Sequence, residues 1–570
     1  MKLSTVRFPV SLSIALAVVF GCRSLYEGTG GSGGGPGAGS TAAPDAFSSA
    51  NGFFSAGSHD VPGGTPMIVE EETAEGEETA SHFRAIQIDP ALEDSAGPVF
   101  VEAADMNGDG LMDLVSGWNQ SQPVQLHLQQ RDADGKVSFK SITIAGTIPG
   151  AEIGSPDDLR GVSIIAGVEP ADFDGQNGLD IAVLVKSTGF ACNSNGVPVE
   201  GPCREGEVYI YFNPGSAGIT DGQQWVETKL TITLANGAIV PTRTDDEIKT
   251  MPEWAGYTAI DAGDIDGDGA PDVVVALNPL DTNRGQLDWY ANPGGQSAQN
   301  GALWAEQARL PSSDWDPSFV KDVELLDVDD DGNLDVIATY PASVSSNIRW
   351  FRNTGGGAFD EGVFRPVGHL DRAPGDQSFG ADVITTGDMD GDGFEDVLVR
   401  STDRKVVQWF RRPVSESPLE PLDPSESPTP SSRFDFPWQV YTLVEYPIRD
   451  PMGIAIGDLT GDGQVDAVVA VGGALEWFDS ALAPAGIYSE WGGTFVIDDT
   501  KEQGTTADPN DPDFRDTATF INNVIVADLD GDGFNDIIAT LNRRVVSGLA
   551  EDSLIWFRNT LGDEVNAASP

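Results

Sequence analysis

Short apolar or alternating segments follow one another along most of the chain. The segments VFVEAA (99–104), TAIDAG (258–263) and NNVIVA (522–527) each precede an acidic loop, and segments rich in β-branched residues, such as DVVVAL (272–277), follow these loops. Period-two alternation and β-branched side chains favour strands over helices. The pattern therefore predicts an all-β chain.

A third segment of most repeats ends in a pair of aromatic residues, and a fourth segment such as FKSITI (139–144) or WQVYTLV (438–444) comes after it. Four strands per repeat predict a small antiparallel sheet, or blade. We attribute the aromatic pairs to packing between neighbouring sheets, whereas stacking on carbohydrate would require exposed rings. The pairs are Trp289/Tyr290, Trp350/Phe351, Trp409/Phe410, Trp477/Phe478 and Trp556/Phe557.

Seven acidic loops of nine residues recur 61 to 92 residues apart, one in each four-strand repeat. Six fourth strands follow a third strand inside the chain, and the seventh, FRAIQID (83–89), precedes the first loop. An N-terminal strand that completes the last blade leaves no open edge in the ring. We therefore predict a seven-bladed β-propeller over residues 83–563. The loops span residues 105–113, 172–180, 264–272, 327–335, 388–396, 458–466 and 528–536.

The loops follow the pattern D-x-D-G-D-G-x-x-D, as in DIDGDGAPD (264–272) and DMDGDGFED (388–396). In this pattern, and at one copy per blade, they resemble FG-GAP/VCBS repeats, which build the propeller of the integrin α-subunit head and occur in many exported bacterial proteins. The resemblance covers residues 83 to about 563. It implies a propeller whose ligands approach the face away from the metals.

Oxygen side chains at loop positions 1, 3, 5 and 9, with glycine at position 6, suit a hard cation with flexible coordination, which favours calcium over magnesium. An EF-hand would need an acidic residue at position 12, where the third loop has Val275 inside a predicted strand. The alternative is that the loops are Asx-rich turns without metal. Calcium would have a structural role here, linking two strands of one blade.

The candidate ligands define up to seven calcium sites, of which six are more strongly expected, because Gln176 and Asn177 replace Asp-Gly in the second loop. They are Asp105, Asn107, Asp109 and Asp113; Asp172, Asp174 and Asp180; Asp264, Asp266, Asp268 and Asp272; Asp327, Asp329, Asp331 and Asp335; Asp388, Asp390, Asp392 and Asp396; Asp458, Asp462 and Asp466; and Asp528, Asp530, Asp532 and Asp536.

The formal net charge of −58 argues against nucleic acid as a partner and against docking on anionic lipid through a basic patch. Cations are the partners that it suggests, although adaptation to a salty habitat would give the same composition. Two cysteines, Cys192 and Cys203, lie in a Gly/Pro/Asn-rich loop. We expect them to form a disulfide, because a metal site there would lack nearby histidines.

The first 22 residues have the layout of a signal peptide and resemble a bacterial lipoprotein signal that ends at a lipidated Cys22. Residues 23–82 are Gly-rich and then acidic, which predicts a flexible tether, residues 564–570 form a tail, and a Pro/Ser-rich stretch (413–432) is expected to be a loop insertion. We therefore expect an exported monomer at the outer membrane or cell surface, in contact with the membrane through a lipid anchor alone. Simple secretion is the alternative.

The leading functional hypothesis is a binding or adhesion module for a protein or glycan ligand, held by the longer loops on the face opposite the acidic loops. An enzyme acting on polysaccharide, lyase-like, is the alternative. The four histidines, among them His127 in a predicted strand, form no Ser/His/Asp constellation along the sequence, so no catalytic residue is assigned. The candidate ligand-face residues are Arg160, Trp254, Tyr257, Trp315, Arg449 and Arg515.

Overall fold

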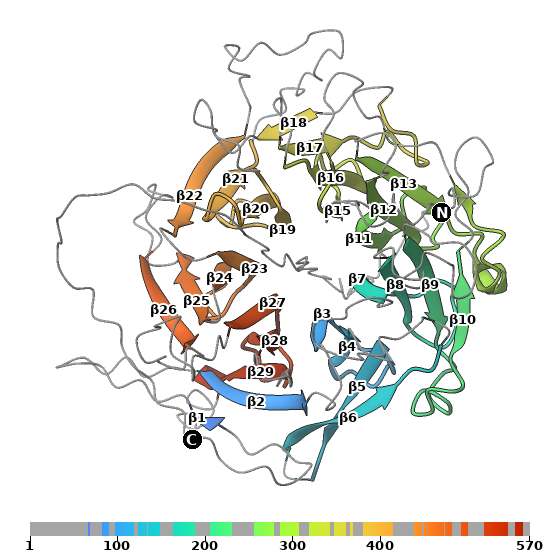
Figure 1. Ribbon diagram of the computed structural model, residues 1–570, viewed down its shortest axis with the longest axis horizontal. Coiled ribbons are helices and arrows are strands. Elements are labelled where there is room, and N and C mark those ends of the chain that lie inside the picture. Colours follow the sequence, from blue (N-terminus) through green and yellow to red (C-terminus); the bar gives the residue numbers. More distant parts are fainter. Residues whose placement is uncertain are drawn as a thin grey trace, which may run out of the picture.

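Seven antiparallel sheets stand in a ring around a common centre in the computed structural model (Figure 1). The prediction of an all-β, seven-bladed propeller is confirmed. The structure describes residues 67–68, 83–90, 97–118, 124–133, 135–146, 148, 163–187, 206–230, 256–278, 285–306, 310, 319–341, 347–360, 365–368, 380–413, 438–446, 450–471, 474–480, 492–499, 518–544 and 553–562.

Blades 1 to 3 each contain four strands in chain order. Blade 1 consists of β3 (Pro98–Ala104), β4 (Asp113–Trp118), β5 (Val124–Arg131) and β6 (Val137–Thr143). Blade 2 consists of β7 (Ser163–Ala171), β8 (Asp180–Ser187), β9 (Gly206–Phe212) and β10 (Val226–Lys229). Blade 3 consists of β11 (Gly256–Gly263), β12 (Asp272–Asn278), β13 (Gln286–Ala291) and β14 (Ala305–Glu306), with a 3-10 helix, η1 (Gly295–Gln299), before β14.

Blades 4 to 6 repeat the same order. Blade 4 consists of β15 (Val323–Leu326), β16 (Asp335–Thr339), β17 (Ile348–Phe351) and β18 (Arg365–Gly368). Blade 5 consists of β19 (Val383–Gly387), β20 (Asp396–Ser401), β21 (Val406–Arg411) and β22 (Gln439–Glu445). Blade 6 consists of β23 (Pro451–Gly457), β24 (Asp466–Val471), β25 (Ala474–Asp479) and β26 (Gly492–Asp499).

Blade 7 joins the two ends of the described chain. It contains β27 (Ala518–Ala527), β28 (Asp536–Arg544) and β29 (Ser553–Asn559), and β2 (Phe83–Pro90) supplies its fourth strand. The pairing of β2 with β29 is antiparallel and runs from Phe83 opposite Asn559 to Pro90 opposite Ser553. This arrangement is the predicted closure by an N-terminal strand.

A fifth strand, β1 (Met67–Ile68), pairs with β2 and lies inside the range predicted as a tether. Its two residues cover part of the outer edge of β2, where unpaired N–H and C=O groups would otherwise face solvent. The tether prediction did not foresee this pairing, because two apolar residues in a Gly-rich and acidic stretch give no strand signal.

The aromatic pairs at the ends of the third strands are buried, as their packing role requires. Trp409 and Phe410 are 1 % and 0 % exposed, and the most exposed ring of the five pairs, Trp477, is only 8 % exposed. Phe83 of the closing strand meets Trp477 edge to face, with ring centroids 6.0 Å apart. These rings fill the space between sheets, so they present no surface for stacking on a sugar.

Several sequence predictions fall outside the described residues. They are the signal peptide with Cys22, most of the tether, Cys192 and Cys203, residues 414–432 of the Pro/Ser-rich loop, and the tail. Among the helices of the described part, none has the length and apolar character needed to cross a membrane.

Candidate metal centres

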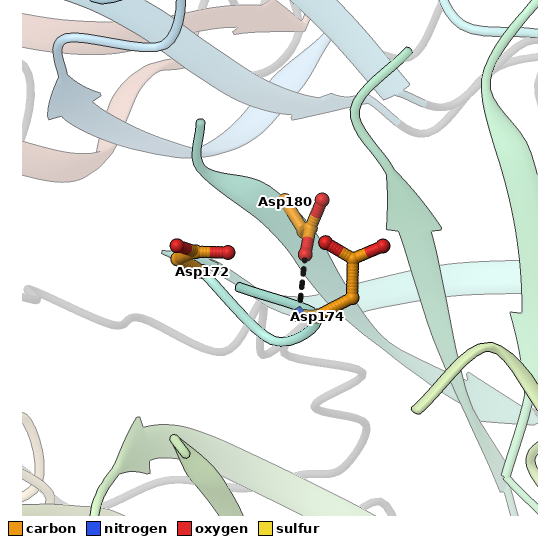
Figure 2. Close-up of side chains that lie close together, drawn as sticks. All are labelled: Asp172, Asp174 and Asp180. Carbon is orange, nitrogen blue, oxygen red and sulfur yellow. Dashed lines mark hydrogen bonds between the residues drawn. The ribbon is translucent and has the colours of Figure 1, made fainter. Parts of the chain in front are cut away.

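Each acidic loop connects the first strand of a blade to the second, and we number the loops 1 to 7 with their blades. In loops 2, 3, 4, 5 and 7, carboxylates at positions 1, 3 and 9 converge, with one oxygen from each within 4.8 Å of the others. Figure 2 shows the loop 2 trio, Asp172, Asp174 and Asp180, around one small space. The other trios are Asp264/Asp266/Asp272, Asp327/Asp329/Asp335, Asp388/Asp390/Asp396 and Asp528/Asp530/Asp536.

The tight turn of each loop depends on left-handed backbone at positions 4 and 6. In loop 3 these positions are Gly267 (φ 76°) and Gly269 (φ 92°). Loop 2 has Asn177 at position 6, and this residue adopts φ 66°. Asparagine tolerates the left-handed region better than most residues. Loop 2, expected from its sequence to depart furthest from the pattern, therefore keeps its three carboxylates together.

Backbone amides hold the carboxylates in place. In loop 3, Asp264 accepts hydrogen bonds from the backbone N–H of Asp268 (3.0 Å) and Gly269 (2.9 Å), and Asp266 accepts one from Asp268 (3.2 Å). Asp268 itself, at position 5, is not in the trio, and its Oδ1 accepts the N–H of Ala270 (2.9 Å). The carboxylates that lie within 4.8 Å of one another are thus those at positions 1, 3 and 9, and the role of position 5 as a ligand stays a prediction.

Some of these oxygens have no hydrogen-bond partner among the described residues. Asp172 Oδ1 in loop 2 and Asp329 Oδ1 in loop 4 are buried without one. A buried carboxylate oxygen that accepts no hydrogen bond is unfavourable, and a hard cation beside it would remove that penalty. The donor set of carboxylates alone therefore fits a cation of the calcium type. The Asx-turn geometry predicted as the alternative is also present, and it arranges the same oxygens.

The aspartate at position 9 is fully buried in all seven loops. In loop 3, Asp272 accepts the N–H of Ile265 (3.0 Å) within the loop and the N–H of Asn292 (2.8 Å) at the end of the third strand. Burial raises the pKa of Asp272 to about 7 and that of Asp180 to about 8. Position 9 therefore fixes the loop to the blade and also contributes to the trio.

Loops 1 and 6 lack a carboxylate at position 3. Asn107 Oδ1 accepts the N–H of Asp109 (2.8 Å), as Asp266 does with Asp268 in loop 3, so a neutral oxygen takes the ligand position. In loop 6, the hydroxyl of Thr460 lies 3.4 Å from Asp458 Oδ1. Both loops keep the same backbone geometry with one negative charge fewer.

A residue at the end of the third strand links each of several loops to the preceding blade. Asn353 of blade 4 donates from Nδ2 to Ile265 O in loop 3 (2.7 Å) and to Leu334 O in its own loop (3.0 Å). Its Oδ1 accepts the N–H of Gly355 (3.0 Å). The equivalent residues that make such links are Asn213, Asn292 and Asn559, and Gln129 does the same across the junction of blades 1 and 7.

These linking residues were missed at the sequence level. The available signal was the asparagine that follows the aromatic segment in YIYFN (209–213), LDWYAN (287–292), IRWFRN (348–353) and LIWFRN (554–559).

The structure brings His127 close to two serines and an aspartate, although the sequence shows no Ser/His/Asp constellation. His127 Nε2 lies 2.7 Å from Ser116 Oγ, and His127 Nδ1 lies 2.8 Å from Ser141 Oγ and 3.6 Å from Asp89 Oδ2. Trp118 Nε1 donates to Ser116 Oγ (2.7 Å). Ser116 and His127 have no exposed surface, and burial lowers the pKa of His127 to about 3. The cluster links blade 1 to the closing strand, with Ser116 and His127 buried and Ser141 and Asp89 toward solvent.

One candidate ligand-face residue, Tyr257, does not lie on the surface, where the sequence predicts it. Tyr257 lies in β11 and is 1 % exposed, because its ring packs among the apolar side chains between blades 2 and 3. It therefore cannot contact a ligand on the surface. Arg160, Trp254, Trp315, Arg449 and Arg515 lie outside the described residues.

Comparison with known proteins covers part of the repeat region. A family model for the FG-GAP-like repeat matches residues 264–338 and 327–399. No curated protein matches the chain with significant similarity.

Solved structures overlap with much of the chain at low identity. A protein from Lactobacillus plantarum is 10 % identical, covering 77 % of this chain and 96 % of its own, with a TM-score of 0.39. The Dos1 propeller is 12 % identical, covering 83 % and 95 %, with a TM-score of 0.36. A protein of unknown function from Dyadobacter fermentans is 11 % identical, covering 83 % and 99 %, with a TM-score of 0.33. From its blades and its family match, the chain is a seven-bladed β-propeller that contains FG-GAP-like repeats.

Proposed function

We propose that this protein is a calcium-stabilised binding module of the cell surface, which holds a protein or glycan ligand on the face away from its acidic loops. The observation that carries the calcium assignment is the convergence of three carboxylates in each of five loops. Calcium accepts six to eight oxygen ligands in flexible geometry, which suits loops that also offer backbone carbonyls and open positions for water.

The role of the ion would be structural. Each trio places three carboxylates within 4.8 Å of one another, and repulsion between them opposes the turn that joins the first two strands of the blade. An ion that binds the folded loop and not the unfolded chain stabilises the fold by mass action. Several such loops in one ring would make the stability of the whole propeller depend on free calcium.

The burial of the one described histidine that contacts serine favours binding over catalysis. Ser116 and His127 are fully buried, so this serine and this histidine cannot reach a substrate. A rigid ring that presents loops is a common scaffold for recognition. Export and a lipid anchor at Cys22 would place this scaffold outside the cell.

Thermal unfolding of the protein with saturating calcium, with chelator and with magnesium tests the calcium assignment. We expect chelator to lower the melting temperature by on the order of 10 °C, because each site that is lost removes about 3 kcal/mol at a hundredfold excess of calcium over the dissociation constant. Magnesium should restore little of this loss. A melting temperature that is the same in calcium and in chelator would disprove the assignment.

Incubation with a panel of acidic and neutral polysaccharides separates binding from catalysis. Retention of the protein on a polysaccharide whose chain length stays constant supports a binding module. Shortened chains would show an enzyme and would refute the proposal.

A further inference from the structure

One position at the end of the third strand, which in blade 4 is the residue before Asn353, divides the acidic loops into two groups. It follows the aromatic pair in register, next to the position 9 aspartate of the paired second strand. It is an arginine in blades 4, 5 and 7 and a different kind of residue in the other four. In blade order these residues are Leu128, Phe212, Ala291, Arg352, Arg411, Asp479 and Arg558.

The arginine of blade 5 reaches directly into its own acidic loop. Arg411 Nε contacts Asp390 Oδ2, and Arg411 Nη2 donates to Asp392 Oδ2 at 2.9 Å. The side chain of Asp390 is only 2 % exposed, so water screens this ion pair weakly. The guanidinium therefore bridges loop positions 3 and 5.

Blade 4 repeats the same contacts. Arg352 Nε contacts Asp329 Oδ2, and Arg352 Nη2 donates to Asp331 Oδ2 at 3.0 Å. Because the arginine takes Oδ2 of Asp329, the other oxygen, Oδ1, remains buried without a hydrogen bond. The arginine thus orients the position 3 carboxylate with its second oxygen left for a cation.

Blade 7 has the third such arginine. Arg558 Nε contacts Asp530 Oδ2, and Arg558 Nη2 lies 3.6 Å from Asp532 Oδ2. Positions 3 and 5 are again the partners. The fixed fork of the guanidinium group matches this recurring pair of carboxylates, which a flexible lysine would hold less well.

Loop 3 has the full set of four carboxylates but no such arginine. Ala291 occupies the equivalent position, and within the described ranges no lysine or arginine forms an ion pair with Asp264, Asp266, Asp268 or Asp272. Among the described residues, the hydrogen bonds to these carboxylates come from backbone amides.

We infer that Arg352, Arg411 and Arg558 are built-in counter-ions, which let loops 4, 5 and 7 fold without metal, whereas loop 3 depends on a bound cation. The inference rests on the proposed calcium binding for its second half. One added positive charge near the ion weakens its attraction to the site by about tenfold. Loop 3 therefore binds its ion more tightly than loops 4, 5 and 7, and these three loops remain folded after the ion leaves.

Two reciprocal variants, in the full chain, test this inference. Arg411→Gln removes a counter-ion, and Ala291→Arg adds one at the partly buried equivalent position of β13, beside loop 3. Lys140→Gln, at an exposed position on β6, is the control for the change in net charge. Melting temperatures are measured in chelator and in saturating calcium, and calcium affinities are measured by titration calorimetry.

We expect Arg411→Gln to lower the melting temperature in chelator much more than in calcium and to tighten one calcium site by about tenfold. Ala291→Arg should raise the melting temperature in chelator and weaken one site by a similar factor. Equal effects of either variant in chelator and calcium, or the same effects from Lys140→Gln, would overturn the inference.

The same data distinguish this failure from failure of the proposed function. If the wild-type melting temperature is the same in chelator and in saturating calcium, calcium stabilisation is refuted. In that case a lower melting temperature of Arg411→Gln in metal-free buffer still supports the counter-ion role, and an unchanged one refutes it. Ala291→Arg adds an interaction, so the test does not depend on the folding of a weakened variant.

Discussion

Replacing Asn353 with alanine isolates the contribution of the links between blades. The side chain is fully buried and makes three hydrogen bonds, of which one crosses from blade 4 to Ile265 O in loop 3. The other two stay within blade 4, to Leu334 O and from the N–H of Gly355. Alanine removes all three and introduces no charge.

The expected loss of stability follows from the groups left behind. Two carbonyls and one N–H lose a partner, and each buried polar group without its hydrogen bond costs about 1–3 kcal/mol. The N–H of Gly355 lies in a partly buried turn that water can reach, and each carbonyl keeps a second lone pair. We therefore take the lower end of the range for each group, and expect a total loss of about 3 kcal/mol.

Urea unfolding in saturating calcium, followed by tryptophan fluorescence, measures this loss as a shift of the midpoint at constant slope. Asn300→Ala is the matched control, because Asn300 is exposed and its side chain accepts one hydrogen bond, 3.2 Å long, from the N–H of Ala302. We expect this control to change stability by less than about 0.5 kcal/mol. A loss below about 1 kcal/mol for Asn353→Ala, or one equal to the control, would refute the linking role.

Two further predictions concern pH and the buried histidine. Burial raises the pKa of Asp272 from 3.8 to about 7, so without metal its contribution to stability is full below pH 4 and is lost as the pH rises through 7. His127 acts in the opposite sense, because burial lowers its pKa from 6.5 to about 3, but one histidine opposes seven such aspartates. In chelator the melting temperature should therefore be higher at pH 5 than at pH 8, and the reverse order would contradict this reasoning. Ser116→Ala should destabilise the protein by about 3 kcal/mol, because it leaves His127 Nε2 and Trp118 Nε1 without their buried partner; its calcium affinity should equal that of the wild type, and a change in affinity would show that the network reaches the loops.

The ring could be predicted from the sequence because each blade carries its own acidic loop between two strand-like segments. The acidic loop marks the turn between two strands, and FRAIQID (83–89) was the missing fourth strand of the last blade. The sequence did not reveal that loop 2 keeps its carboxylates together, because the effect of Asn177 depends on backbone conformation, and its φ of 66° lets it replace glycine there.

Contacts between distant segments could not be predicted in the same way. Asp89 meets His127 because the closing strand lies beside blade 1, and nothing local to either residue specifies that meeting. Asn353 finds its acceptor at Ile265, in another blade, and only the assembled ring places the two side by side. Tyr257 follows a glycine in a stretch that predicts a loop, and its burial depends on where β11 begins.

The closure of blade 7 also constrains the order of folding during synthesis. A chain is synthesised from its N-terminus, so β2 emerges long before β29, its partner in the finished sheet. Pairing across such a separation is slow, because the loop between the two strands must be closed first. Until then β2 has an unpaired edge that other chains can occupy. The edge of β2 is thus paired only after β29 has been synthesised. In the interval between the synthesis of β2 and that of β29, this unpaired edge exposes the nascent protein to proteolysis and aggregation.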